Sequence, residues 1–242
     1  MATDGTAASF YEWMKVGSRQ SAQHVVPVLT ELVGPGSVVD VGCGTGSWLK
    51  VFEEHGVTDV FGYDTAAVPR ELLEIEAERF RAADVTAPLD ADRRFDLALC
   101  MEVAQFNPKD TAAPLVANLA ALAPVVLFSA GIPGQGGGGP NQRWPIYWAN
   151  HFSDHGFACV DCVRERVWDE PEVKSWYVQN MLLFVEGAAL EAKPALAREY
   201  ERGQGRPLSV VHPRVFARVS GRLARVEAAL EEAGLGPSES SG

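Results

Sequence analysis

Short runs of β-branched and other apolar residues alternate with helical patterns along the middle of the chain. Strands are predicted at 37–41, 59–63, 80–83, 95–101 and 124–130. The segments 47–55, 69–77 and 111–122 between them have helical patterns. Strands and helices that alternate at this spacing predict right-handed crossovers and a parallel sheet.

The pattern changes on both sides of this core. Residues 7–33 predict one or two helices, interrupted near Gly17 and Pro27, and the sequence GPG at 34–36 ends them. The glycine-rich segment 131–140 predicts a mobile loop, which we expect to close over a substrate. After an aromatic-rich helix at 143–155, two long strands at 157–168 and 175–185 are joined by DEPE. This short connection predicts a hairpin, so the sheet ends with an antiparallel strand.

Charge and composition narrow the classes of protein. The length of 242 residues fits one domain. The chain has 21 basic and 32 acidic side chains, and the resulting net charge of −11 argues against binding to a nucleic-acid duplex. No apolar run is long enough to cross a bilayer and the N-terminus lacks a signal-peptide pattern, so we expect a cytoplasmic protein without membrane contact. Four cysteines are too few for a disulfide scaffold. Cys159 and Cys162 are expected to point to opposite faces of a strand, which disfavours joint binding of a metal.

Residues 187–236 have helical composition, and 238–242 are expected to be disordered. Four arginines in this tail are spaced 4, 4 and 3 residues apart and would share one face of a helix: Arg214, Arg218, Arg222 and Arg225. The first interpretation of this stripe is a solvated face. The alternatives are a contact in a homodimer and a contact with an acidic substrate.

The strongest chemical signal is the segment VVDVGCGTG at 38–46, between the first strand and the first helix of the core. A glycine turn at this place lets the backbone approach a ligand closely. The spacing G-x-G-x-G with Asp40 before it suits a ligand with an amino-acid end and a ribose, without a pyrophosphate. Asp64 ends the second strand, 22 residues after Gly42, where an acidic group can accept hydrogen bonds from ribose hydroxyls. Asp84 follows the third strand and can accept a hydrogen bond from an adenine amino group.

The motifs VVDVGCGTGSW, GYD, AAD and FDLALCMEVAQFNP resemble those of class I S-adenosylmethionine-dependent methyltransferases, over residues 20–186. The resemblance implies an α/β fold: a Rossmann-like, doubly wound sheet of seven strands, mostly parallel with the last strand antiparallel. It divides the chain into an N-terminal helical cap at 1–36, a cofactor-binding core at 37–186 and a C-terminal helical extension at 187–242.

The same resemblance implies a role for individual residues toward S-adenosylmethionine. Gly42, Gly44 and Gly46 would lie against its methionine part, together with Asp40. Asp64 would bind the ribose, and Asp84 with Val85 would frame the adenine. Met101 and Glu102 would border the cofactor near its sulfonium, and Ser18, Arg19 and Ser21 would cap its carboxylate.

The segments FSAGIPGQGG, RWPIYWANHF, RERVWDEPEVKSWYVQN and VVHPR also resemble a bacterial group of small methyltransferase-domain proteins. Members of that group have E-V-A-E-H-L and G-H-V-N-E-Q-W-P motifs, which are similar to the metal site of RNA ribose methyltransferases. In this chain Gln105 and Phe106 replace the Glu-His pair, and the second motif lacks its histidine. Since Glu102 alone is a poor ligand set for a divalent cation, we expect no catalytic metal.

Three residues are candidates for catalysis. Glu102 is a candidate base, cofactor ligand or helix-start residue, and Gln105 can orient an acceptor through its amide, as Gln135 and Asn141 can. His151 is a candidate base, with a surface or core histidine as the alternative. An aromatic set either lines a site for a ring-bearing substrate or packs in the core: Trp144, Tyr147, Trp148, Trp176 and Tyr177.

The sequence therefore predicts a metal-independent methyltransferase that uses S-adenosylmethionine, releases S-adenosylhomocysteine and acts on a small molecule. The acceptor is expected to be a secondary metabolite, aromatic in one interpretation, methylated on oxygen or nitrogen. An alternative is a cyclase, an isomerase or a binding subunit that keeps the cofactor but has lost methyl transfer. A third interpretation is a nucleic-acid or tRNA methyltransferase, which the arginine stripe alone favours and the acidic composition disfavours.

Overall fold

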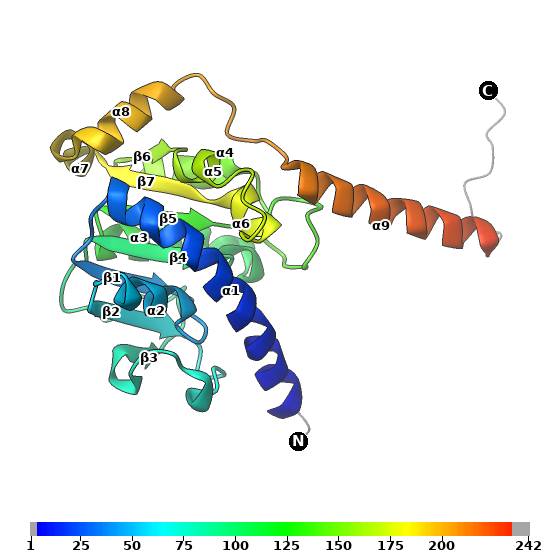
Figure 1. Ribbon diagram of the computed structural model, residues 1–242, viewed down its shortest axis with the longest axis horizontal. Coiled ribbons are helices and arrows are strands. Elements are labelled where there is room, and N and C mark those ends of the chain that lie inside the picture. The colour runs from blue at the N-terminus through cyan, green and yellow to red at the C-terminus, as the bar shows by residue number, and fades with distance from the viewer. Residues whose placement is uncertain (1–3, 234–242) are drawn as a thin grey trace.

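A computed structural model describes residues 4–233 of the chain, so the expected disorder at 238–242 lies outside the described residues. Its centre is a seven-stranded sheet in the order β3-β2-β1-β4-β5-β7-β6 (Figure 1). The strands are β1 (Ser37–Val41), β2 (Asp59–Asp64), β3 (Phe80–Ala82), β4 (Leu97–Met101), β5 (Val125–Ser129), β6 (Phe157–Val160) and β7 (Leu182–Glu186). Strands β1 to β5 pair in parallel, whereas β7 is antiparallel to both of its neighbours, β5 and β6. The predicted fold class, a mostly parallel doubly wound sheet with an antiparallel last strand, is confirmed.

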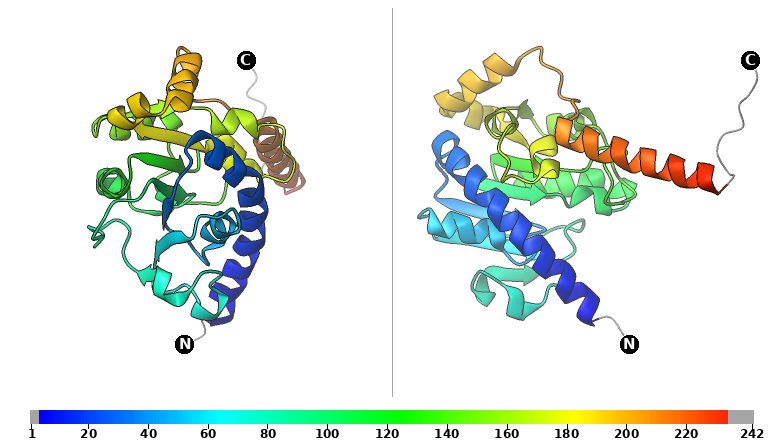
Figure 2. Two further views of the ribbon diagram at one scale, coloured as in Figure 1. Left: turned by 60° about the vertical axis from the view of Figure 1, so that its left-hand side comes forward. Right: turned by 45° about the vertical axis from the view of Figure 1, so that its right-hand side comes forward.

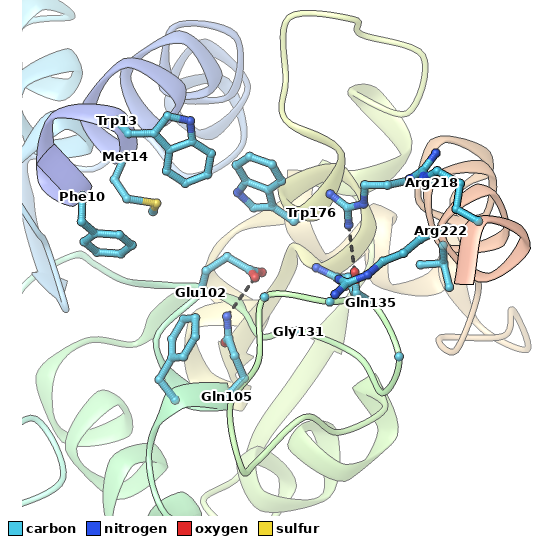
Figure 3. A pocket seen from close by; sticks show the side chains of 16 residues that line it. Phe10, Trp13, Met14, Glu102, Gln105, Gly131, Gln135, Trp176, Arg218 and Arg222 are labelled. Carbon is cyan, nitrogen blue, oxygen red and sulfur yellow. Dashed lines mark hydrogen bonds between the residues drawn. The ribbon is translucent and has the colours of Figure 1, made fainter. Parts of the chain in front are cut away.

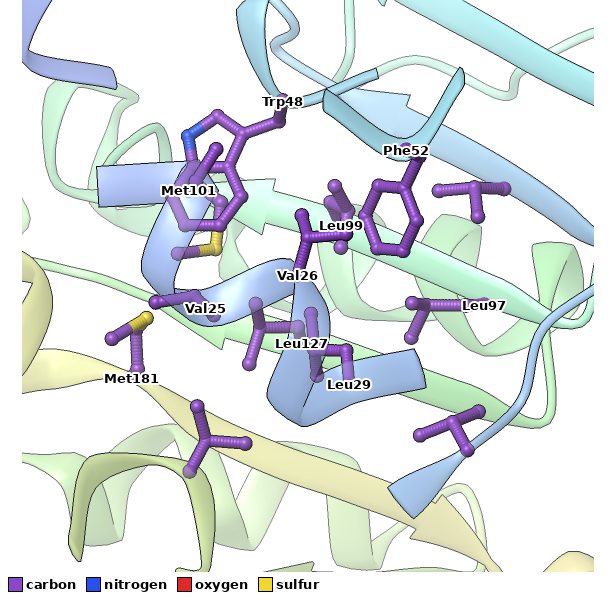
Figure 4. Packing of buried hydrophobic residues seen from close by; sticks show 14 of the residues in the cluster. Val25, Val26, Leu29, Trp48, Phe52, Leu97, Leu99, Met101, Leu127 and Met181 are labelled. Carbon is purple, nitrogen blue, oxygen red and sulfur yellow. The ribbon is translucent and has the colours of Figure 1, made fainter. Parts of the chain in front are cut away.

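Helices cover both faces of the sheet because the strands are apolar on both faces (Figure 2). One face packs against α1 (Asp4–Leu32) and α2 (Ser47–Glu54), and the other packs against α3 (Ala112–Leu122) and α4 (Pro145–Ser153). Side chains alternate accordingly along β4, where Leu97 and Leu99 face α1 while Ala98 and Cys100 face α3. Figure 4 shows Val25, Val26 and Leu29 of α1 against the leucines of β4 and β5.

The C-terminal part contains α5 (Val163–Arg166), α6 (Ser175–Asn180), α7 (Gly187–Ala192), α8 (Pro194–Gly203) and α9 (Pro213–Glu232). Helix α9 extends away from the sheet (Figure 1), but its first turn is firmly attached. His212 accepts a hydrogen bond from the Arg214 amide and its Nε2 lies 2.8 Å from the Trp168 carbonyl oxygen, while Val215 is buried. None of the helices within 4–233 combines the length and apolarity that a membrane span requires.

The predicted hairpin of two long strands is wrong in its details. Strand β6 ends at Val160, and 161–181 contains α5 and α6 instead of strand. Val163 and Val167, four residues apart, both face the core, as they would on a helix. The antiparallel pairing of β6 and β7 is correct, but a long helical connection joins them.

Two helix predictions also need correction. The N-terminal segment is one continuous helix through Gly17 and Pro27, because its buried face, including Val25 and Val26, packs against the sheet and outweighs the local breakers. The helix predicted at 69–77 is absent. That region forms two short 3-10 turns, η1 (Arg70–Leu72) and η2 (Ala77–Arg79), neither of which has a buried residue.

Candidate functional site

The glycine turn lies between β1 and α2, at the carboxyl edge of the parallel strands. The amides of Gly42 and Cys43 donate to the carbonyl oxygen of Tyr63, at 2.7 Å and 3.1 Å, and so tie the turn to β2. Gly42, Gly44 and Gly46 have φ of 87°, 55° and 82°, a region that favours glycine.

Only one of these glycines borders open space. A Cβ on Gly42 would lie 2.2 Å from a methyl carbon of Val103, and one on Gly46 would lie 2.9 Å from Ile75. A Cβ on Gly44 would have no atom within 4 Å. The first two positions therefore require glycine for packing, whereas Gly44 borders open space from which a ligand can approach its backbone.

Two carboxyl groups lie close to the turn, Asp64 in direct contact with Gly44 and Asp40 near Asp64. Asp40 is 1% exposed, and its Oδ1 has no hydrogen-bond partner among the described residues. Burial, followed by the negative charge of Asp64, raises the pKa of Asp40 to about 8. Asp64 accepts hydrogen bonds from the amides of Gly44 and Thr65, both at 2.6 Å, and burial raises its pKa. A buried acceptor without a partner fits a ligand that brings a hydrogen-bond donor such as an ammonium group.

The other residues predicted around the cofactor have varied surroundings. The Ser18 hydroxyl lies 3.0 Å from the Tyr177 hydroxyl. The Arg19 guanidinium donates to Glu54 and Glu74, so a ligand carboxylate would compete there with two protein carboxylates.

At the end of β3, Val85 is buried against the α3 side of the sheet. Asp84 is exposed and accepts hydrogen bonds from the amide and hydroxyl of Thr86, which lower its pKa. Asp84 therefore forms a local turn and presents its carboxyl edge to solvent.

Glu102 follows Met101 at the end of β4 and has an unusual backbone. Its φ of 60° makes it the one non-glycine residue within 4–233 with a positive φ. Its amide donates to the carbonyl oxygen of Ser129 at 2.9 Å and lies 3.0 Å from the hydroxyl oxygen of the same residue. Such backbone strain is concentrated at functional sites in proteins.

The Glu102 carboxylate accepts one hydrogen bond on each oxygen. Asn180 Nδ2 donates to Oε1 at 2.9 Å, and Gln105 Nε2 donates to Oε2 at 3.0 Å. Asn180 also donates to Gln135 Oε1 at 3.0 Å, which connects the carboxylate to the glycine loop. Burial raises the pKa of Glu102 to about 7 although these hydrogen bonds lower it. A carboxyl group with this pKa can accept and release a proton near neutral pH.

Glu102 lines a cavity of about 400 Å³ that opens beside the loop 131–140 (Figure 3). The rest of the lining comes from α1 (Phe10, Trp13, Met14), the segment after β4 (Gln105, Phe106), the loop (Gly131, Gly134, Gln135, Gly136, Gly137), α6 (Trp176) and α9 (Arg218, Val219, Arg222, Arg225). The predicted candidates Glu102, Gln105 and Gln135 thus meet in one place.

The structure places the other catalytic candidate elsewhere. His151 lies on α4 with its ring against Tyr147, at 4.7 Å between centroids, and it does not line the cavity. Of the predicted aromatic set, Trp176 alone lines the cavity, whereas Trp148 and Tyr177 are buried in the two cores.

Among residues 4–233, no three His, Cys, Asp or Glu side chains are close enough to form a metal site. Cys159 belongs to β6 and Cys162 precedes α5, and both are free thiols whose pKa burial raises to about 12.

Sequence reasoning missed two contributors to the cavity. Asn180 donates a hydrogen bond to Glu102, which lies 78 residues earlier in the chain. No local sequence pattern relates two residues so far apart. Phe10, Trp13 and Met14 form the aromatic end of α1. Trp13 and Met14 follow Phe10 by three and four residues, a spacing that places all three on one apolar face of a helix. The sequence did not indicate that this face borders a cavity.

Comparison with known proteins shows what this chain is similar to. Residues 12–120 match a family model described as a methyltransferase domain. No curated protein sequence matches the chain.

Solved structures of methyltransferases have a similar fold. Human N-acetylserotonin methyltransferase in complex with SAM aligns with a TM-score of 0.51 and 15% identity, over 76% of this chain and 57% of that one. Magnesium protoporphyrin IX methyltransferase from Synechocystis with bound SAM aligns with a TM-score of 0.51 and 20% identity, over 71% and 81%. DesVI from Streptomyces venezuelae aligns with a TM-score of 0.53 and 14% identity, over 74% and 98%. The chain thus spans less than two thirds of the human enzyme, and at these identities the likeness concerns the fold.

Proposed function

We propose that the chain is a methyltransferase of the class I fold and that it transfers a methyl group from S-adenosylmethionine to a small molecule. One observation carries the proposal. The open backbone at Gly44 and the ionisable Glu102 beside a cavity occur at the same carboxyl edge of the sheet, after the neighbouring strands β1 and β4. Open α/β sheets bind their ligands at this edge.

The residues of the turn fit the cofactor. Asp40 Oδ1 would accept a hydrogen bond from the ammonium group of its methionine part, Gly44 would lie against that part, and Asp64 would accept from the ribose hydroxyls. When bound, S-adenosylmethionine supplies a methyl group that the sulfonium already activates. The protein therefore has to position the acceptor and take up its proton.

The Asp64→Ala variant is expected to bind the cofactor about 1–3 kcal/mol more weakly, because a buried hydrogen-bonding partner is lost. Calorimetric titration with S-adenosylhomocysteine measures this difference. Asp90→Ala, at a side chain that is 99% exposed, is the matched control and should leave the affinity unchanged. Equal affinity of the Asp64→Ala variant and the native protein would show that the ribose binds elsewhere.

Cofactor affinity is expected to depend on pH through Asp40. Since its pKa is raised to about 8, this side chain is mostly protonated at neutral pH, and an ammonium ligand requires the carboxylate. Between pH 6 and 7.5 the affinity for S-adenosylhomocysteine should rise about twentyfold, since the ionised fraction grows nearly tenfold for each pH unit well below the pKa. In the Asp40→Asn variant the affinity should be lower and nearly constant over the same range. A native affinity that does not change with pH would rule out this role for Asp40.

Glu102 is the general base in this proposal. It accepts the proton that leaves an acceptor hydroxyl or amine in the cavity, and a pKa of about 7 suits this task. Asn180 and Gln105 orient the carboxylate through their amide groups.

Gln105 also suits the protonated form of Glu102. Its Oε1 is buried without a hydrogen-bond partner in the described part of the chain. A half-turn of the Gln105 amide would direct this oxygen to the protonated carboxyl group, so the same side chain can bond to both states of the base. Asn180 is less free to turn, because its Nδ2 also bonds to Gln135.

The size of the cavity favours a small acceptor. About 400 Å³ is within the range of pockets that enclose drug-sized molecules, and its walls are mostly apolar. We infer that the acceptor is a metabolite, with secondary metabolites as the leading class.

Incubation of the protein with S-adenosylmethionine and either a metabolite extract or bulk tRNA tests this function, with released S-adenosylhomocysteine as the readout. Release with the metabolite extract alone is expected. Cofactor binding without release on any extract would favour a protein that has lost methyl transfer, and release with tRNA alone would identify a nucleic-acid substrate.

A further inference from the structure

The cavity has a cationic wall made by the middle turns of α9. Arg218, Arg222 and Arg225 all line it from this helix. The start of the helix is fixed, since Arg214 donates to the carbonyl oxygens of Glu170 and Val173 at 3.0 Å and 3.1 Å. The three arginines are exposed side chains of a helix whose first turn is attached to the rest of the protein.

These arginines lack acidic partners. Arg218, Arg222 and Arg225 form no salt bridge within 4–233, although the whole chain has a net charge of −11 and many other arginines are paired, such as Arg19 with Glu54. Arg218 donates instead to the backbone oxygen of Gln135 at 3.0 Å. Arg222 and Arg225 thus bring two positive charges to the cavity that no protein carboxylate neutralises in the described structure.

The opposite wall is aromatic. Phe10 and Trp13 of α1 lie across from α9, and Trp176 of α6 lies between them (Figure 3). The rings of Trp13 and Trp176 are 6.0 Å apart between centroids. Trp13 is 61% exposed and Phe10 is 52% exposed, so the two rings form an exposed apolar patch on the cavity, and such patches mark binding sites. Glu102 lies on the floor between the two walls.

We propose that the methyl acceptor is an aromatic or similarly planar apolar molecule with a carboxylate or phosphate group, and that Arg222 and Arg225 bind this group. The proposal rests on the proposed function, because the acceptor is what fills the cavity beside Glu102. A guanidinium group forms paired hydrogen bonds with either anion, and the tryptophan rings pack against a planar body. Arg218 contributes charge, while its guanidinium stays bonded to the loop.

Three probes that share one ring system test this inference: naphthoate, naphthyl phosphate and the neutral naphthalenemethanol. Each is titrated into the full chain by calorimetry, without cofactor. At least one anionic probe should bind about tenfold or more tightly than the neutral probe, as expected when charge-assisted hydrogen bonds are added. Tighter binding of naphthoate would indicate a carboxylate acceptor, and tighter binding of naphthyl phosphate would indicate a phosphate acceptor.

The Arg222→Gln and Arg225→Gln variants should each lose most of the preference for the anionic probe and keep the affinity for the neutral one. The Trp13→Ala variant should bind all three probes more weakly than the native protein. Arg198→Gln is the matched control, because this exposed arginine of α8 forms no salt bridge among the described residues and does not line the cavity. It should behave as the native protein.

Equal binding of neutral and anionic probes, or an anion preference that survives both arginine variants, would overturn the inference. A different measurement, the binding of S-adenosylhomocysteine, tests the proposed function. If S-adenosylhomocysteine does not bind while the anion preference disappears in the arginine variants, the anion site stands and the methyl-transfer proposal alone is overturned.

Discussion

The Gly44→Val variant is expected to lose cofactor binding, with an affinity for S-adenosylhomocysteine that falls roughly a hundredfold or more. A side chain on Gly44 would occupy the open space beside the turn, where a Cβ has no protein atom within 4 Å and where the cofactor is proposed to bind. Forcing extra atoms into a fitted contact costs on the order of 1–3 kcal/mol, and a ligand that cannot approach the backbone also loses its contacts with the turn. Calorimetric titration of the purified variant measures the loss.

Gly56→Val provides the matched control for this prediction. Gly56 follows α2, has a positive φ of 90° and likewise has no atom within 4 Å of an added Cβ. Both variants force a branched residue into the left-handed region, so both should lower the melting temperature by similar amounts. Only the Gly44 variant should lose cofactor. Native affinity in Gly44→Val, or equal losses in the two variants, would contradict the location of the cofactor.

The Glu102→Gln variant is expected to lower kcat by about 10²–10⁴, the usual contribution of a general base, with cofactor affinity nearly unchanged. The native kcat/KM should decrease as the pH falls through about 7, because the base must be ionised. The residual activity of the variant should lack this pH dependence. Release of S-adenosylhomocysteine, followed from pH 5.5 to 8.5 with an active extract, tests both expectations.

This variant should also fold. Gln105 and Asn180 each have an amide oxygen without a partner in the described residues, so a turned amide can accept a hydrogen bond from the new side chain. Burial raises the pKa of Glu102 above its ordinary value of 4.5, so its ionisation opposes folding increasingly as the pH rises toward about 7. Glutamine lacks this cost, and at pH 8 the variant should melt no lower than the native protein. A stable variant with native kcat would exclude Glu102 as the base.

Much of the fold could be predicted from the sequence because the strands of the parallel core are short, apolar and separated by helices. The strands that contain VVDV and LALCM are buried on both faces, and their nearly continuous runs of apolar residues indicate this burial. The predictions failed where tertiary packing outweighs local preference. Gly17 and Pro27 lie inside one helix, and the segment 161–181 forms helices although its apolar residues resemble those of a strand.

The candidate site could be predicted in part. The glycine turn with Asp40 and Asp64 has a local pattern, since its residues follow β1 and β2 directly. The surroundings of Glu102 have no such pattern, because Asn180 and the arginines of α9 are brought to it by the C-terminal part of the chain. The positive φ of Glu102 was equally hidden, as no sequence rule assigns this conformation to a glutamate.

A crystal structure of the protein with S-adenosylhomocysteine would test the central claim most directly. The claim requires electron density for the nucleoside between Gly44 and Asp64, with the sulfur directed to the cavity beside Glu102. Density for the same compound at another edge of the sheet, or an empty turn in crystals grown at saturating concentration, would contradict it.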